Sequence, residues 1–363
     1  MQLTVKAKKL NKRTSIPAFL PDPKNIAGIV NENFIFEGEE VTSVPNPALG
    51  KWCADRDGHF YWGGGLDLPL ESFTKVTDKL LKLPTQPINY TAQFQNFGTN
   101  GSGIRVGILD NGFFPHDAFM NQVKIIKDFT AATGNCEDLH GHGTHVAGII
   151  GARLKDVSVP VIGVCPECEL IIGKVIPDQG GFNDIDFVIK GIDWAISQGV
   201  KVLNLSIAVS EVNVAVLKPA IQRASDANII IVAPAGDVKE LDNNAAQYPA
   251  SQFDCCISVA EVSNTYLNTN PQINPNINFL SGYSHYMSTS IPLHDFYEPM
   301  RGSSMATAFI SGLATRFISQ EKNNGRDINS IKKDEVISEL KKICVLKTNL
   351  NFFDFSDFKI ATI

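Results

Sequence analysis

The chain has little of what marks secreted, membrane-spanning or nucleic-acid-binding proteins. Residues 1–13 are basic and polar, and no apolar run follows them that would form a secretory signal or a membrane span. The 32 Lys and Arg residues stand against 38 Asp and Glu residues, and no basic stripe with interleaved aromatic residues is present. We therefore expect a cytoplasmic protein that has neither nucleic acid nor a membrane as a partner. The sequence favours no particular oligomeric state.

Cysteine is also scarce, and its pattern argues against a disulfide framework. The seven residues form an odd set without a repeating spacing: Cys53, Cys136, Cys165, Cys168, Cys255, Cys256 and Cys344. Reduced thiols inside a cell are the expected state. Cys165 and Cys168 also allow half of a zinc site or a redox pair, with His140, His142 and His145 nearby in sequence. A structural zinc site needs four ligands in a closed tetrahedron, so we expect no metal here.

The remaining composition favours a large α/β domain with a smaller appendage. The chain has 363 residues, of which 44% are hydrophobic, enough for a sizeable core. From about residue 104, short apolar runs alternate with amphipathic stretches of helix length, which is typical of a mostly parallel sheet with helices on both faces. The expected strands are 104–109, 169–176, 200–207, 229–235 and 255–262. In such sheets reactive groups gather at the carboxyl ends of the strands.

Residues 1–80 have a different pattern and are predicted to form a small β-rich module ahead of a catalytic domain at 81–363. The stretch 52–62 favours a hairpin, with Asp57 and Gly58 in its turn and aromatic residues on its strands. It loosely resembles the SH3-like modules fused to bacterial hydrolases. Its aromatic residues form either an ordinary core or a binding surface. The region is expected to be a retained module, and the alternative is a propeptide.

Three segments carry residues suited to acyl transfer. Asp110 ends a buried strand, although an Asp there is commonly a turn residue or a helix cap. His142 stands among small residues at a helix start, and a fixed backbone of this kind suits a general base. Ser304 begins an apolar helix predicted over 304–317. It either caps that helix or uses the backbone N–H groups and the helix dipole to favour developing negative charge.

In this chain order, the three segments resemble the motifs of the subtilisin family, peptidase S8. They read Asp-Asn-Gly at 110–112, His-Gly-Thr-His-Val-Ala-Gly at 142–148 and Gly-Ser-Ser-Met-Ala-Thr at 302–307, and further similar segments lie at 163–166, 191–195, 202–206 and 248–250. The resemblance covers about residues 85–345 and implies a subtilisin-like α/β fold and a serine endopeptidase. It implies that Ser304 attacks the peptide carbonyl, His142 carries the proton and Asp110 orients the imidazolium.

The resemblance also implies a substrate cleft and an oxyanion position, and the chain departs from the family pattern at both. The implied cleft residues are Ser206, Ile207, Ala208, Pro234, Ala235 and Gly236. The family has a glycine-rich segment where this chain has residues 207–209, whose added β-carbons should narrow the cleft and restrict specificity. At the oxyanion position the family has Asn and this chain has Asp237. An ionised carboxylate accepts hydrogen bonds but cannot donate one.

Asp237 leaves three alternatives open. Burial beside another negative charge would keep it protonated and able to donate, it would swing away from the site, or the chain is a weak or inactive homologue. A prohormone convertase of the wider family resembles this chain in having Asp there, so the exchange is compatible with proteolysis. The leading hypothesis is a serine endopeptidase of restricted specificity that acts on peptides or proteins. The competing hypotheses are a pseudoprotease that binds peptide along the strand near Ser206 and a recruiter that works through residues 1–80.

No cofactor is expected. Family members often carry a calcium loop, but the corresponding stretch of this chain, residues 152–160, offers only Asp156 as an obvious charged oxygen ligand. One carboxylate is too few for a dedicated calcium site.

Overall fold

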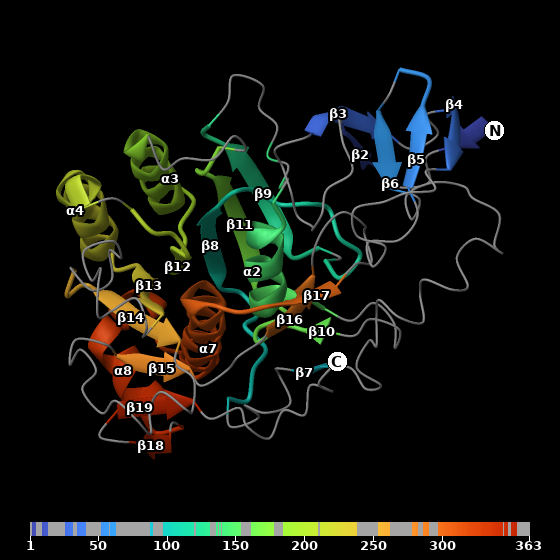
Figure 1. Ribbon diagram of the computed structural model, residues 1–363. Coiled ribbons are helices and arrows are strands. Elements are labelled where there is room, and N and C mark those ends of the chain that lie inside the picture. The colour runs from blue at the N-terminus through green and yellow to red at the C-terminus, as the bar shows by residue number, and fades with distance from the viewer. Residues whose placement is uncertain are drawn as a thin grey trace.

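The centre of the computed structural model is a nine-stranded sheet with helices on both faces (Figure 1). Its strand order is β18-β19-β15-β14-β13-β12-β8-β11-β9, and all neighbours are parallel except β18 with β19. The strands are β8 (Arg105–Asp110), β9 (Val123–Asp128), β11 (Glu169–Lys174), β12 (Val202–Asn204), β13 (Ile230–Asp237), β14 (Cys256–Glu261), β15 (Phe279–Ser281), β18 (Val345–Lys347) and β19 (Leu350–Phe353). The structure describes residues 2–4, 9–13, 26–31, 35–40, 52–57, 59–62, 88–89, 97–119, 121–130, 136, 138, 140–153, 161–177, 184–209, 211–237, 253–261, 278–281, 286–289, 297–343, 345–347 and 350–353.

Two hydrophobic cores lie on opposite faces of the sheet. Val106 and Ile108 of β8 belong to one core, and Leu109 belongs to the other, because successive side chains of a strand point to opposite faces. The first core is covered by α2 (His142–Gly151), α7 (Ser303–Asn323) and α8 (Lys333–Lys341), with the short 3₁₀ helix η8 (Ile328–Ser330) beside them; the second is covered by α3 (Ile185–Ser197) and α4 (Glu211–Asp226). The predicted fold class is therefore confirmed.

The predicted strands are present, with some different bounds. Strand β12 covers only Val202–Asn204 of the predicted 200–207. Strand β13 continues to Asp237, two residues beyond the predicted end at 235. The edge strand β9 was not predicted, because most of its side chains are exposed and it contains no buried apolar run. Two small sheets pair β7 (Ile88–Asn89) with β10 (Val161–Ile162) and β16 (Tyr286–Thr289) with β17 (Tyr297–Met300). Within the described ranges, no helix combines the length and apolar character needed to cross a membrane.

Helix α7 is the central buried helix, as predicted for residues 304–317. Its side chains are buried almost without interruption from Ser303 to Ser319. Gly312 lies where α7 meets the loop before β11, and a β-carbon at this position would stand 2.5 Å from Cβ of Val164. The small residues of this helix therefore allow close packing against the loop that follows β10.

We expect Gly312→Ala to lower the free energy of unfolding by about 1–3 kcal/mol, because the added methyl overlaps a β-branched side chain that cannot swing away. Urea denaturation measures the change. Gly98→Ala is the matched control, because Gly98 is exposed and nothing lies within 4 Å of its added β-carbon. Equal midpoints for the two variants would contradict the packing described for α7.

The N-terminal residues form a separate six-stranded sheet with the order β1-β4-β5-β6-β2-β3. Its strands are β1 (Gln2–Thr4), β2 (Lys9–Arg13), β3 (Ile26–Asn31), β4 (Ile35–Glu40), β5 (Trp52–Asp55) and β6 (Phe60–Trp62). The predicted hairpin is present, since β5 and β6 pair antiparallel with Trp52 opposite Trp62. The domain boundary at residue 80, the SH3-like character and the choice between module and propeptide stay predictions.

Candidate active site

Asp110 and His142 form a hydrogen-bonded pair at the carboxyl end of the sheet. Asp110 is the fully buried last residue of β8, and His142 is the first residue of α2, with 31% of its side chain exposed. Nδ1 of His142 lies 2.8 Å from Oδ1 and 3.1 Å from Oδ2 of Asp110. Because Nδ1 is engaged by the carboxylate, Nε2 is left to exchange a proton with a reacting group.

The electrostatic surroundings of His142 favour its charged form. Burial alone lowers the pKa of His142, but three effects outweigh it and leave the pKa above its ordinary value: the charge of Asp110, the hydrogen bond that Nδ1 donates to Asp110 and the charge of Asp138. A general base must be neutral to accept a proton. His142 would therefore work best in neutral to alkaline solution.

The start of α2 is held by side chains from outside the helix. Asn111, the residue after Asp110, accepts a hydrogen bond at 2.8 Å from the backbone N–H of Gly143. A β-carbon at Gly143 would clash with the backbone oxygen of Gly112 and lie 2.9 Å from Oδ1 of Asn111. Glycine thus allows the end of β8 to approach α2 closely, which brings Asp110 within reach of His142.

Ser304 is hydrogen-bonded to the segment that follows β12, the strand next to β8. It is the second residue of α7 and is partly exposed. Its hydroxyl donates to the carbonyl oxygen of Ser206 at 3.4 Å, and Oγ of Ser206 donates to the carbonyl oxygen of Ser304 at 3.0 Å. Asn204 lies opposite Ile108 in the β12–β8 register, so the segment after β12 runs beside Asp110. The hydrogen bond between His142 and Ser304 stays a prediction.

The predicted cleft segments follow β12 and end β13. The side chain of Ile207 is 2% exposed and packs in the core beneath α3 and α4, so Ile207 has only its backbone available to a substrate, whereas Ala208 is partly exposed.

The second cleft segment is the end of β13. Pro234 of this strand pairs with Val259 of β14, and the register shifts before Asp237 pairs with Glu261. Ala235 and the backbone of Gly236 lie between them in β13. The side chain of Asp237 lies outside the described residues, so its role in the oxyanion site stays a prediction.

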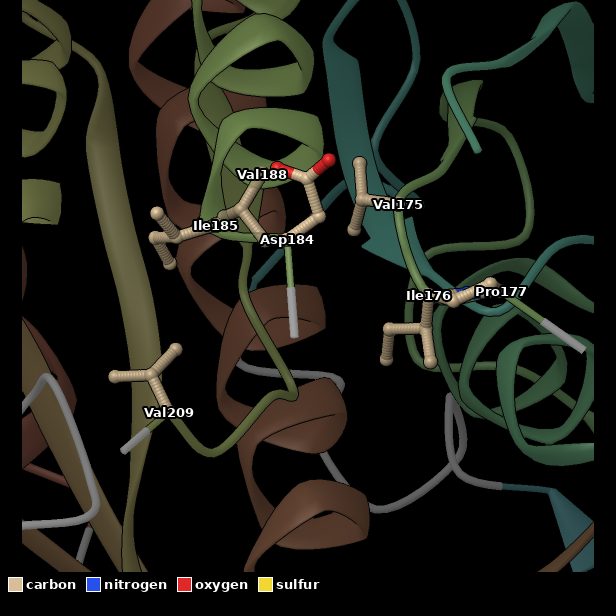
Figure 2. Close-up of a pocket in the computed structure, with 7 residues that line it drawn as sticks. All are labelled: Val175, Ile176, Pro177, Asp184, Ile185, Val188 and Val209. Atoms are coloured by element: carbon tan, nitrogen blue, oxygen red, sulfur yellow. The ribbon is translucent and has the colours of Figure 1, made fainter. Parts of the chain in front are cut away.

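A small apolar pocket adjoins this strand-end edge (Figure 2). It is lined by Val175, Ile176 and Pro177 after β11, by Asp184, Ile185 and Val188 at the start of α3, and by Val209. Backbone N–H groups of Val175 and Ile176 donate to the carbonyl oxygen of Asp110 at 2.8 and 3.3 Å, so the pocket begins beside the backbone of Asp110, on the face of the sheet that α3 covers. About 260 Å³ of empty space lies among these residues, open solvent included, and the enclosed part has room for about one water molecule. Asp184 also caps α3 by accepting from the N–H of Asp186.

The sequence analysis missed Asp138, which is completely buried beside the Asp110–His142 pair. Its Oδ1 accepts hydrogen bonds from the backbone N–H groups of His140 at 2.9 Å and Gly141 at 2.7 Å. Its Oδ2 accepts from the N–H and the hydroxyl of Thr144 at 2.8 and 2.7 Å. An Asp in the loop before a predicted helix start commonly accepts hydrogen bonds from nearby backbone N–H groups, and that signal was available in the sequence.

One group of potential metal ligands is present among the described residues. Asp55, Asp57 and His59 lie together in the turn of the N-terminal hairpin. The carboxylate of Asp55 accepts hydrogen bonds from the N–H groups of Asp57 and His59 and from the hydroxyl of Tyr61. These bonds stabilise the hairpin turn, and they account for the position of Asp55 without a metal ion. The stretch around Asp156, considered for calcium, lies outside the described residues.

A parallel α/β sheet with Asp, His and Ser at its carboxyl edge defines a subtilisin-like protease fold, and comparison with known proteins agrees. The sequence profile of the subtilase family matches residues 101–344, and the chain belongs to that family. The chain is 30% identical over 257 residues to the major intracellular serine protease of Bacillus subtilis (strain 168). The aligned region covers 67% of this chain and 76% of that protein. The chain is also 29% identical over 242 residues to subtilisin DY of Bacillus licheniformis, spanning 64% and 83%.

A solved structure gives the same result for the fold. The crystal structure of a cold adapted subtilisin-like serine proteinase matches with a TM-score of 0.55 at 20% identity, over 70% of this chain and 88% of that one. The subtilisin-like fold predicted from the sequence motifs is thus confirmed. The family consists of serine proteases, which places this chain among serine-type endopeptidases in general.

Proposed function

We propose that this chain hydrolyses peptide bonds with Ser304 as nucleophile, His142 as general base and acid, and Asp110 as the orienting carboxylate. Oγ of Ser304 bonds to the peptide carbonyl carbon while its proton passes to Nε2 of His142. The carbon–nitrogen bond then breaks as His142 returns the proton to the leaving amine, and water releases the acyl group by the same path. The observation that carries this proposal is the Asp110–His142 hydrogen bond, and Ser304 is hydrogen-bonded to Ser206 on the segment that follows the neighbouring strand β12.

The test is cleavage of an internally quenched peptide library, with the new termini identified by mass spectrometry. Cleavage at internal bonds supports an endopeptidase. Tight binding without cleavage would instead support the pseudoprotease, in which the strand after Asn204 holds an extended peptide.

We also propose restricted specificity, because the pocket of Figure 2 is small and lined mostly by apolar side chains. Val209 is 3% exposed and its side chain borders the pocket from the segment that continues past Ser206. A substrate chain paired with this segment would direct a side chain toward the pocket. Small apolar substrate side chains fit it best, and charged ones lose their hydration there.

Val209→Ala should widen the pocket and raise kcat/KM for a peptide with a large apolar residue, relative to one with Ala, by about tenfold. The measurement is the ratio of kcat/KM for two peptides that differ only at this position. Val216→Ala is the matched control, since Val216 is 49% exposed on α4, and its ratio should stay unchanged. An unchanged ratio in Val209→Ala would mean that substrates do not enter this pocket.

We propose in addition that the protein acts inside the cell. None of the six described cysteines forms a disulfide, and one of the relatives is named an intracellular serine protease. Fractionation of the native cells with an antibody to the chain tests the location. Recovery of the protein from the medium alone would overturn this part of the proposal.

A further inference from the structure

Asp138 is buried near both members of the Asp110–His142 pair, close enough for its charge to act on them, without belonging to the proposed triad. We propose that Asp138 is a positioning residue that clamps the backbone around His142 and, through its negative charge, makes His142 a stronger base. The inference rests on the proposed function, because the strength of His142 as a base matters only if His142 moves protons during the reaction.

The clamp consists of four hydrogen bonds to one carboxylate. Gly141, directly before His142, donates to one oxygen, and Thr144, two residues after His142, donates to the other through both its N–H and its hydroxyl. His142 thus lies between the two points that Asp138 holds. Shifting its backbone would break hydrogen bonds to a fully buried carboxylate, which is costly.

Neighbouring elements hold the same clamp in place. The hydroxyl oxygen of Thr144 accepts from the N–H of Phe114, on the loop after β8, at 2.9 Å. The carbonyl oxygen of Thr144 accepts from the hydroxyl of Thr289 on β16 at 2.8 Å. Through Thr144, Asp138 therefore connects the start of α2 to the loop after β8, the strand that carries Asp110. These hydrogen bonds help to fix the distance between Asp110 and His142.

The hydrogen bonds of Asp138 require its ionised form. Burial and the nearby charge of Asp110 raise the pKa of Asp138 against the opposing effect of its hydrogen bonds. All four partners, however, are donors, and each oxygen accepts two of them. A protonated carboxyl group would direct its own hydrogen at one of these donors. We therefore take Asp138 as ionised in the pH range where His142 is a neutral base.

The charges of two carboxylates act on His142. Asp110 approaches from β8 and Asp138 from the loop before α2, and the charges of both raise the pKa of His142. The first turn of α7 contains no acidic residue, and the described residues of β16 and β10 carry no charged side chain. Lys174 of β11 lies opposite Asp110 in the sheet register. Removing the charge of Asp138 would thus leave Asp110 as the one carboxylate stabilising the imidazolium within the described surroundings.

The experiment is an NMR titration of the His142 ring in Ser304→Ala protein, with and without Asp138→Asn. We expect Asp138→Asn to lower the pKa of His142 by about half to one pH unit, because a buried negative charge no longer stabilises the imidazolium. Asp138→Glu keeps the charge and should keep the pKa close to that of the parent. The matched control is Asp193→Asn on the outer face of α3, where Asp193 pairs with Arg223 at 2.8 Å, and it should leave the titration unchanged.

A merely structural Asp138 gives a different result: Asp138→Asn would lower the unfolding midpoint without moving the His142 titration, and this would overturn the inference. If Asp138→Asn does not fold, Asp138→Ser provides a second, smaller neutral variant whose hydroxyl can accept a hydrogen bond. Cleavage of the peptide library by the unmodified chain keeps the two proposals separate. Cleavage with no shift in the titration refutes the role of Asp138 alone, and a shift without cleavage refutes the proposed protease instead.

Discussion

Ser304→Ala should abolish peptide hydrolysis, with kcat falling by about 10⁶-fold, the loss that follows removal of the nucleophile in subtilisin itself. The physical reason is that Ala has no oxygen to form the acyl bond. A water molecule that replaced the hydroxyl as nucleophile would not be held in position at the start of α7. Turnover of a quenched peptide measures the loss, and the unfolding midpoint checks that the fold is kept. The hydroxyl of Ser304 makes one long bond, at 3.4 Å, so its removal should cost little stability.

Ser303→Ala is the matched control for this prediction. Ser303 precedes Ser304 in α7 and is buried, whereas Ser304 is partly exposed. The control should lose far less activity than Ser304→Ala. If both variants kept full turnover, Ser304 would not be the nucleophile and the proposed mechanism would be wrong.

Asp237→Asn should raise kcat in alkaline solution by up to about 100- to 1000-fold, because it supplies a permanent hydrogen-bond donor to the oxyanion at nearly the same volume. With Asp237 in place, donation needs the protonated carboxyl group, which is lost as the pH rises. His142 needs the opposite, since its pKa is raised and it becomes neutral only as the pH rises. These opposite requirements predict that kcat of the parent chain follows a narrow bell-shaped curve against pH, whereas kcat of the variant reaches a broad alkaline plateau.

The measurement is kcat for both forms on one peptide from about pH 5 to about pH 9. Asp226→Asn is the control for removing a negative charge, since Asp226 is exposed at the end of α4. This control should leave the pH profile as it is. If Asp237→Asn left rate and profile unchanged, Asp237 would not lie at the oxyanion site, and the assignment of this segment would have to be abandoned.

The sequence was sufficient to predict those parts of the site that depend on local pattern. Asp110 ends a strand whose apolar run is buried on both faces, and that run identified both the strand and its end. Ser304 starts a helix with hardly any polar face, and such a helix can only be central in a two-faced sheet. The order of the three motifs then distinguished the family, which no single motif did.

The features that sequence could not give depend on contacts between distant segments. The pocket of Figure 2 joins Ile176, Ile185 and Val209, which lie in three separate segments of the chain. Ile207 was expected in the cleft, but whether its side chain faces the cleft or the core depends on where the β12 ladder stops. The exposed strand β9 lacks an apolar run and is defined by pairing with β11.

Covalent labelling with a fluorophosphonate tests the central claim most directly, because the probe reacts only with a serine activated by a neighbouring base. The account predicts one added phosphonyl group per chain, located by mass spectrometry on Ser304, and labelling that grows as the pH rises through the raised pKa of His142. Ser304→Ala and His142→Ala should both remain unlabelled. A folded chain that takes up no probe at any pH from about 5 to about 9, or takes it up on another residue, would contradict the account.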